Sequence, residues 1–103
     1  MRNVVVRYTT RPEAASENQA LVEKVFQDLH ASEPDGLRYA TFRLDDGVTF
    51  VHVARIDTAN GVNPLAGLSA FVDFSRDIED RCEQPPVAQG ATVVGAYRFF
   101  DET

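Results

Sequence analysis

The side chains best able to do chemistry are those of His52, Arg43, Tyr39 and Tyr97. His52 stands in the largely apolar run 48–56, where a neutral imidazole could serve as general base toward a phenolic proton. Arg43 could orient an anionic or enolate oxygen through two parallel hydrogen bonds. The two tyrosines could donate hydrogen bonds to a ligand carbonyl. These residue types together predict proton transfer on a small ligand that carries a phenolic or carbonyl oxygen.

Each of these side chains also has a purely structural interpretation. His52 could pack at an interface with its ring satisfied by a neighbouring hydroxyl or backbone group, since geometry rather than residue type defines a general base. Arg43 could pair with the carboxylate of Asp45 at the surface, where such a pair contributes little. Tyr39 and Tyr97 could be half-buried packing residues with their hydroxyls at a wet edge.

The segments 37–44 and 48–56 predict a β-hairpin around these residues. Both are rich in β-branched and aromatic residues, and Asp45-Asp46-Gly47 separates them. An Asp-Gly pair adopts the positive φ angles that tight hairpin turns need, so this connection is a turn.

The register of that hairpin decides the surroundings of His52. If Asp-Gly forms a two-residue turn, His52 faces Thr41 across the hairpin and shares its sheet face with Tyr39 and Arg43. If the loop has three residues, His52 faces Ala40 in an apolar layer. A slip of one residue moves every side chain to the opposite face, and the sequence leaves both registers open.

The remaining elements predict one α+β domain over residues 1–103. A strand is expected at 4–9, a helix from 12 to 31, a second helix from 64 to 82 capped by Asn63, and a last strand at 91–100. The resulting order, β-α-β-β-α-β, is the ferredoxin-like sandwich, in which two helices cover one face of a four-stranded antiparallel sheet.

Composition excludes several classes of function. The chain has 10 basic and 16 acidic residues and a net charge of −6, which disfavours nucleic acid and anionic membranes as partners. The only cysteine, Cys82, excludes an internal disulfide and a cysteine-rich metal site, and we expect no metal and no cofactor. Without a signal peptide or an apolar stretch long enough to cross a bilayer, the expected location is cytoplasmic.

The predicted strands carry apolar side chains on both of their faces. Val4, Val5 and Val6 are consecutive, and residues 97–100 read Tyr-Arg-Phe-Phe, so the sheet face without helices is also apolar. Such a patch marks an interface or a ligand surface. We expect a symmetric homodimer through this open face, with the polar candidate residues embedded in it.

The chain resembles the dimeric α+β barrel superfamily and, within it, antibiotic biosynthesis monooxygenase-like domains. The resemblance covers nearly the whole chain. It consists of the length, the element order, the segment 39–55 and the run Asn63-Pro64-Leu65 followed by Leu68 and Phe71. It implies a dimeric α+β barrel with a pocket, between sheet and helices or inside the barrel, for a small and often aromatic molecule.

Activities within that family differ, and the sequence narrows them. Some members oxidise polycyclic phenols with molecular oxygen and no metal, flavin or haem, using Asn, Trp, Tyr and Arg residues around the phenol. Others degrade haem and carry a Trp and an axial His on the second helix. This chain has no Trp, and the residues of its second helix include no His, so the haem-degrading activity is disfavoured.

Two functional hypotheses follow. The first is a cofactor-independent monooxygenase of an aromatic or quinol-type substrate, and the second is a non-catalytic dimeric module for ligand binding or assembly. In the first, the catalytic residues are His52 and Arg43, and the substrate-binding residues are Tyr39, Phe50, Asn63, Phe71 and Tyr97.

Overall fold

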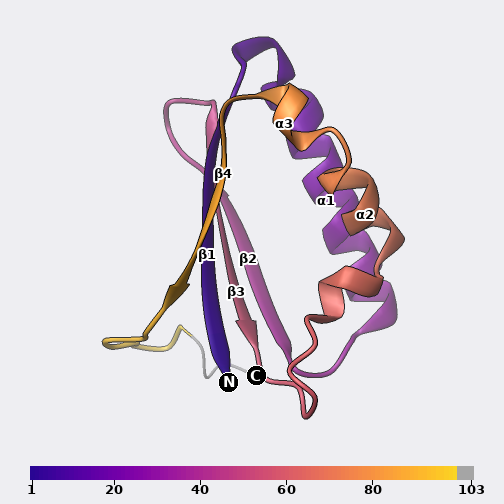
Figure 1. The fold of residues 1–103 in the computed structure, drawn as a ribbon, viewed down its shortest axis with the longest axis vertical. Coiled ribbons are helices and arrows are strands. Elements are labelled where there is room, and N and C mark those ends of the chain that lie inside the picture. Colours follow the sequence, from indigo (N-terminus) through magenta and orange to yellow (C-terminus); the bar gives the residue numbers. More distant parts are fainter. Residues whose placement is uncertain (100–103) are drawn as a thin grey trace.

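The computed structural model describes residues 1–99 and confirms the α+β sandwich with a single sheet. The first half of the chain forms β1 (Arg2–Thr10), a 3-10 turn at Pro12–Ala14, α1 (Ala15–Ser32), β2 (Leu37–Arg43) and β3 (Thr49–Ile56). The second half forms a 3-10 turn at Pro64–Gly67, α2 (Ser69–Ser75), α3 (Ile78–Arg81) and β4 (Cys82–Ala91). All three helices lie on the same side of the sheet (Figure 1).

The sheet has the strand order β2-β3-β1-β4 and every neighbouring pair is antiparallel. Its helix-facing side carries the buried core, which centres on Tyr8, Phe50, Val25, Leu65 and Phe74. None of the helices within residues 1–99 is long and apolar enough to cross a membrane.

The hairpin between β2 and β3 adopts the first of the two possible registers. Thr41 pairs with His52, and the ladder continues until the Leu44 amide donates to the Thr49 carbonyl at 2.8 Å. Asp46 fixes the turn because its carboxylate accepts from the Val48 amide and from both the amide and hydroxyl of Thr49. These hydrogen bonds, led by the Thr49 hydroxyl, lower the pKa of the Asp46 carboxyl.

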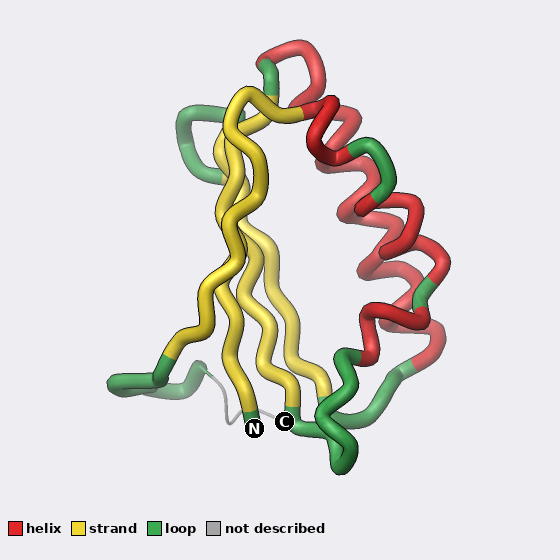
Figure 2. Tube along the Cα trace, viewed as in Figure 1, coloured by secondary structure: helices red, strands yellow, loops and turns green. Residues whose placement is uncertain are grey.

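The last strand is displaced from its predicted place. The prediction of a strand over residues 91–100 is wrong for residues 92–99, and Phe100 lies outside the described part of the chain. The chain leaves α3 at the end of β1, where the Arg11 amide donates to the Arg81 carbonyl, and pairs at once from Cys82 opposite Thr10 to Ala91 opposite Asn3. That pairing uses the whole length of β1. Residues 92–99 therefore have no strand beside them and run as a loop on the side of the sheet opposite the helices (Figure 2).

Pro85 and Pro86 follow the predicted second helix directly, and in the local sequence they favour a helix terminus rather than a strand. They lie instead inside β4, an edge strand, where the register with β1 shifts between Arg7 and Thr9. Proline lacks a backbone N–H, and edge strands and bulges are the positions in a sheet that tolerate this loss.

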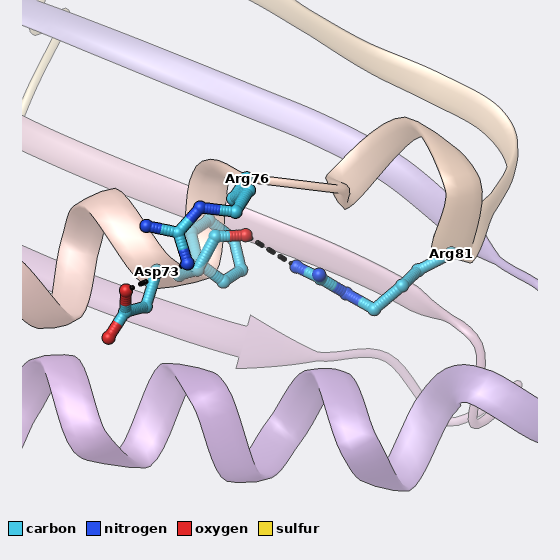
Figure 3. A network of polar contacts seen from close by, with 4 residues as sticks. Asp73, Arg76 and Arg81 are labelled. Carbon is cyan, nitrogen blue, oxygen red and sulfur yellow. Dashed lines mark hydrogen bonds and ion pairs between the residues drawn. The ribbon is translucent and has the colours of Figure 1, made fainter.

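The second predicted helix is also interrupted. Asn63 caps its start as expected, accepting from the Leu65 amide at 3.0 Å, but the segment divides into a 3-10 turn, α2 and α3. Asp77 at the second break has a left-handed φ of 53°. In Figure 3 the Arg81 side chain reaches back to a backbone carbonyl, that of Phe74, which it meets at 2.6 Å. A continuous helix would give this carbonyl to the amide four residues later, so the arginine takes the place of that helical bond.

The close turn between α1 and β2 generates a test of the fold. Gly36 has a φ of 79°, and a Cβ there would lie 2.8 Å from the Asp57 carbonyl oxygen. Gly47 has a φ of 80° with nothing within 4 Å of a Cβ. Both alanine variants should lose about 1 kcal/mol to left-handed strain. Gly36→Ala should lose about 1–3 kcal/mol more by steric clash, as measured by urea unfolding. Equal losses in the two variants would contradict the close contact.

Candidate functional site

A cavity of about 380 Å³ lies between the helix-facing side of the sheet and the segment that runs from Asn63 through α2 to α3. Its walls are mainly apolar and include Val6, Ile56, Leu65 and Phe74. His52 and Tyr39 line it from the sheet. A cavity of this size, mostly apolar with a few convergent polar groups, is the usual form of a small-molecule site.

His52 is the polar centre of the cavity wall and is only 4% exposed. Its Nε2 lies 2.7 Å from the Tyr8 hydroxyl, and its Nδ1 lies 2.6 Å from the Tyr39 hydroxyl and 2.9 Å from that of Thr41. The β-ladder produces this cluster, because Val6 and Thr41 flank His52 on the two neighbouring strands. Both ring nitrogens therefore have partners within the protein.

Burial determines the ionisation of these groups. It lowers the pKa of His52 to about 4, so the imidazole is neutral at pH 7. Burial likewise raises the pKa of Tyr39 to about 12 and raises that of Tyr8 still further above its usual value. The site thus holds one neutral imidazole between two protonated phenols.

A buried polar chain continues from Tyr8 away from the cavity. The Asn18 Nδ2 donates to the Tyr8 hydroxyl at 2.9 Å, and the Arg81 Nε donates to the Asn18 Oδ1 at 3.1 Å. Asn18 is fully buried and Arg81 is 6% exposed. We call the set Arg81, Asn18, Tyr8, His52 and Tyr39 the polar chain.

Sequence reasoning missed three members of the polar chain as functional candidates. Asn18 falls at helical spacing with Leu21, Val22 and Val25, on the apolar stripe of α1. A lone Asn on such a stripe is itself a signal, because a buried amide needs partners. Side chains alternate along a strand, so Tyr8 points to the same sheet face as Val4 and Val6, the face that the helices cover. Arg81 follows two acidic residues and carries no sequence signal of burial.

The structure brings together four of the seven predicted site residues. Tyr39, His52, Asn63 and Phe71 all line the cavity. Since the Asn63 Oδ1 accepts from the Leu65 amide, its NH₂ group is left as the donor that a ligand could use.

The other three predicted residues lie away from the cavity. Phe50 is 1% exposed and stacks on Tyr8 in the core, with ring centroids 5.6 Å apart. Arg43 sits beyond it, with its guanidinium over the Phe50 ring, and donates to the Gly47 carbonyl and the Gln19 Oε1. Tyr97 is 80% exposed in the loop after β4.

The polar candidates do not lie in the open face of the sheet, so that expectation is wrong. The pairing of Thr41 with His52 turns His52 and Tyr39 toward the helices. The open face instead presents the residues of the opposite parity. These include apolar Val5, Ala40, Phe42, Val51 and Val53, together with Arg7, Arg38 and Arg55. Within the described part of the chain, no three His, Cys, Asp or Glu side chains gather as ligands for a metal ion.

Comparison with known proteins gives matches in structure. No protein-family model and no curated protein matches the chain. Rv0793 from Mycobacterium tuberculosis matches with a TM-score of 0.73 at 20% identity, covering 92% of this chain and 96% of that one. An antibiotic biosynthesis monooxygenase matches with a TM-score of 0.74 at 18% identity, covering 92% and 100%. A variant of SnoaB, a cofactor-independent oxygenase from Streptomyces nogalater, matches at 0.67 and 15% identity, covering 94% and 96%.

These matches extend over nearly the full length of both chains, and their identities are low. They establish the fold: the chain has the ferredoxin-like α+β fold of antibiotic biosynthesis monooxygenase-like proteins. The resemblance drawn from the sequence is thereby confirmed at the level of the fold.

The neutral state of buried His52 generates a pH prediction. The unfolded chain takes up a proton near pH 6.5, whereas the native state does so only near 4, so the native state is favoured above 6.5 and loses that advantage as the pH falls. Between pH 7 and 5 the free energy of unfolding should drop by about 2 kcal/mol through this group.

Urea unfolding at a series of pH values measures this slope. The His52→Asn variant should lose most of it, and a matched His30→Gln variant, which changes the exposed histidine of α1, should keep it. The same slope in wild type and His52→Asn would contradict a neutral buried imidazole.

Proposed function

We propose that the chain is a cofactor-independent monooxygenase whose aromatic, phenol- or quinol-type substrate occupies the cavity beside Tyr39 and His52. The observation that carries this proposal is the cluster of buried hydroxyl and imidazole groups on the wall of an otherwise apolar cavity of about 380 Å³. An apolar wall accepts a ring system, and the polar cluster addresses one oxygen on it. The names of the structural neighbours, antibiotic biosynthesis monooxygenase and cofactor-independent oxygenase, support the same activity.

The hydrogen bonds support a different role for each of the two residues at the cavity wall. Both nitrogens of His52 are engaged by protein hydroxyls, so Tyr39 is the group placed to touch the substrate oxygen. His52 then holds and polarises the Tyr39 hydroxyl from behind. Asn63 and Phe71 complete the contact, through an amide donor and an apolar ring.

The reaction that this site supports uses the substrate as the source of electrons. In an anthrone-like substrate the phenolate or enolate form reduces molecular oxygen, and a CH₂ group becomes a carbonyl. One oxygen atom enters that carbonyl, and the other leaves as water together with the two hydrogens of the CH₂ group. The protein's contribution is to bind the anion and exclude bulk water.

Oxygen consumption tests the enzymatic proposal. With anthrone or a naphthoquinol, wild type should consume oxygen well above the protein-free rate. Tyr39→Phe and His52→Gln should each lower kcat/KM at least about tenfold, because each disturbs the donor at the substrate oxygen. Lys24→Gln, on the exposed side of α1, serves as the surface control and should match wild type. A wild-type rate equal to the protein-free rate would rule out turnover of these substrates.

A non-catalytic ligand-binding module is the second candidate function. It is favoured by the complete internal satisfaction of His52, which leaves no free imidazole nitrogen at the cavity. In that case the same aromatic compounds bind in the cavity and dissociate unchanged. Binding without oxygen consumption would select this alternative.

We also propose a homodimer formed through the open sheet face. Val5, Val51 and Val53 form its centre, half-buried in the single chain, and Phe42 is 45% exposed on the same face. The loop after β4 runs on that side of the sheet (Figure 2), and Val94 in this loop is exposed. A second copy presents the same apolar patch, so a two-fold axis matches apolar surface with apolar surface.

Light scattering measures the assembly directly. At micromolar concentration the mass should be near twice 11.4 kDa. Val53→Glu places a charge in the middle of the open face and should give a monomer, whereas Val62→Glu, in the exposed loop before Asn63, should leave the mass unchanged. A wild-type monomer would contradict the dimer.

A further inference from the structure

Arg81, at one end of the polar chain, has hydrogen-bond donors and no acceptor. This property determines the direction of every hydrogen bond in the chain. Guanidinium groups have N–H donors and no acceptor, so the Arg81 Nε–H must donate to the Asn18 Oδ1. This fixes the amide orientation of Asn18 and leaves its NH₂ group to donate to the Tyr8 hydroxyl. Tyr8 therefore accepts from Asn18.

The same argument extends to His52. The Tyr8 hydroxyl has one proton to donate, and its remaining partner among residues 1–99 is the His52 Nε2 at 2.7 Å. Nε2 must then carry the lone pair, and the single proton of the neutral imidazole sits on Nδ1. In the opposite tautomer Nε2–H and Asn18 would both donate to Tyr8, and the buried Tyr8 proton would have no acceptor within the described residues.

The last step reaches the cavity. The His52 Nδ1 atom lies 2.6 Å from the Tyr39 hydroxyl oxygen, the shorter of its two hydroxyl contacts, so in this tautomer its N–H donates to Tyr39. Tyr39 accepts this bond and a second one from the Thr41 hydroxyl, and it retains its own proton. Since Tyr39 lines the cavity, that proton is available to a bound molecule.

We propose that Arg81, Asn18, Tyr8, His52 and Tyr39 form a one-directional chain of hydrogen-bond donors that ends in a Tyr39 hydroxyl donating into the cavity, so that the cavity selects an anionic oxygen, as in a phenolate or enolate. Asn18 and Arg81 are positioning residues in this arrangement, because they act on the ligand only through Tyr8, His52 and Tyr39. The ligand class deepens the proposed function and rests on it. The direction of the chain does not depend on that function.

Charge at the far end reinforces this preference. Arg81 is buried, and its contacts are the Asn18 amide, the Phe74 carbonyl and the Phe74 ring. Acidic residues, among them Glu17 and Asp77, line the same surface hollow as Arg81, but no carboxylate of residues 1–99 forms an ion pair with it. A buried positive charge behind a line of aligned donors polarises each bond toward the cavity. Hydrogen bonds to an ionised acceptor are about twice as strong as those to a neutral one, so the Tyr39 hydroxyl favours the anion.

The tautomer of His52 tests the direction of the chain without any ligand. The protein has two histidines, and ¹⁵N spectra of the imidazoles distinguish Nδ1–H from Nε2–H, with His30→Gln assigning the signals. In wild type the Nδ1–H form of His52 should exceed the other at least about tenfold.

The Asn18→Asp variant reverses the chain at one atom. A carboxylate accepts from Arg81 but cannot donate to Tyr8, so the Tyr8 hydroxyl donates to the carboxylate instead. The proton of the neutral His52 ring then moves from Nδ1 to Nε2, which donates to Tyr8. Gln19→Glu, which adds the same charge one residue along α1, should leave the tautomer as in wild type. A wild-type Nε2–H tautomer, or an unchanged tautomer in Asn18→Asp, would overturn the proposed direction.

Binding of 4-nitrophenol tests the ligand class, because its phenolate and neutral forms differ in absorption. The wild-type protein should bind the phenolate at least about tenfold more tightly than the neutral phenol, which appears as ionisation at lower pH in the bound state. Tyr39→Phe should abolish this preference, while its affinity for 4-nitroanisole, which has no ionisable group, stays within about twofold of wild type.

The two measurements separate the possible failures. Preference for the neutral phenol in wild type would overturn the anion selectivity. No binding of either compound would contradict the proposed function and the ligand class together, and the ¹⁵N spectra would still decide the direction of the chain.

Discussion

His52 is buried, and the need to satisfy both of its ring nitrogens links strand register, helix placement and the break in the second helix. His52 sits in the middle of the sheet under the helices, and each of its nitrogens needs a partner, because an unsatisfied buried polar group costs about 1–3 kcal/mol. β1 supplies Tyr8, and β2 supplies Tyr39 and Thr41. The Tyr8 hydroxyl in turn accepts from Asn18 of α1, and the Asn18 side-chain oxygen accepts from Arg81. The Arg81 guanidinium also donates to the Phe74 carbonyl near the end of α2, where the helix breaks. Strand register, helix placement and the interrupted second helix are thus connected through a single side chain.

The sequence predicts those parts of the fold that local chemistry controls. The Asp-Gly turn, the Asn63 cap and the apolar stripe of α1 each involve neighbours within a few residues, and the structure confirms all three elements. The prediction of the last strand is wrong because two segments of the chain could pair with β1. Which of them pairs depends on where α3 ends relative to β1. Pro85 and Pro86 appear as helix terminators in a local analysis and become edge-strand residues only when the sheet order is known.

The candidate site divides in the same way. Tyr39 and His52 are thirteen residues apart on one hairpin, so the choice of register alone brings them together. Arg81 lies 63 residues from Asn18, and no periodicity or motif relates them. Arg43 shares the face of His52, yet Phe50 of the next strand lies under its guanidinium and the cavity does not reach it. Residue type identified the chemistry of the cavity wall, whereas the support behind that wall depends on tertiary packing.

Side chains alternate between the two faces of the sheet, so one face lines the cavity and the other forms the open face. Every residue that lines the cavity lies between Arg2 and Ala88 of one chain, on the helix side of the sheet or in the segments packed over it. The valines of the open face point the other way and contribute nothing to the cavity. In the proposed dimer, a second copy on the open face would cover the sheet without entering the cavity, so the cavity is formed by one chain whether or not the proposed dimer assembles. This separation requires the hairpin register with Thr41 opposite His52, because a slip of one residue would exchange the two faces and leave the imidazole at the interface.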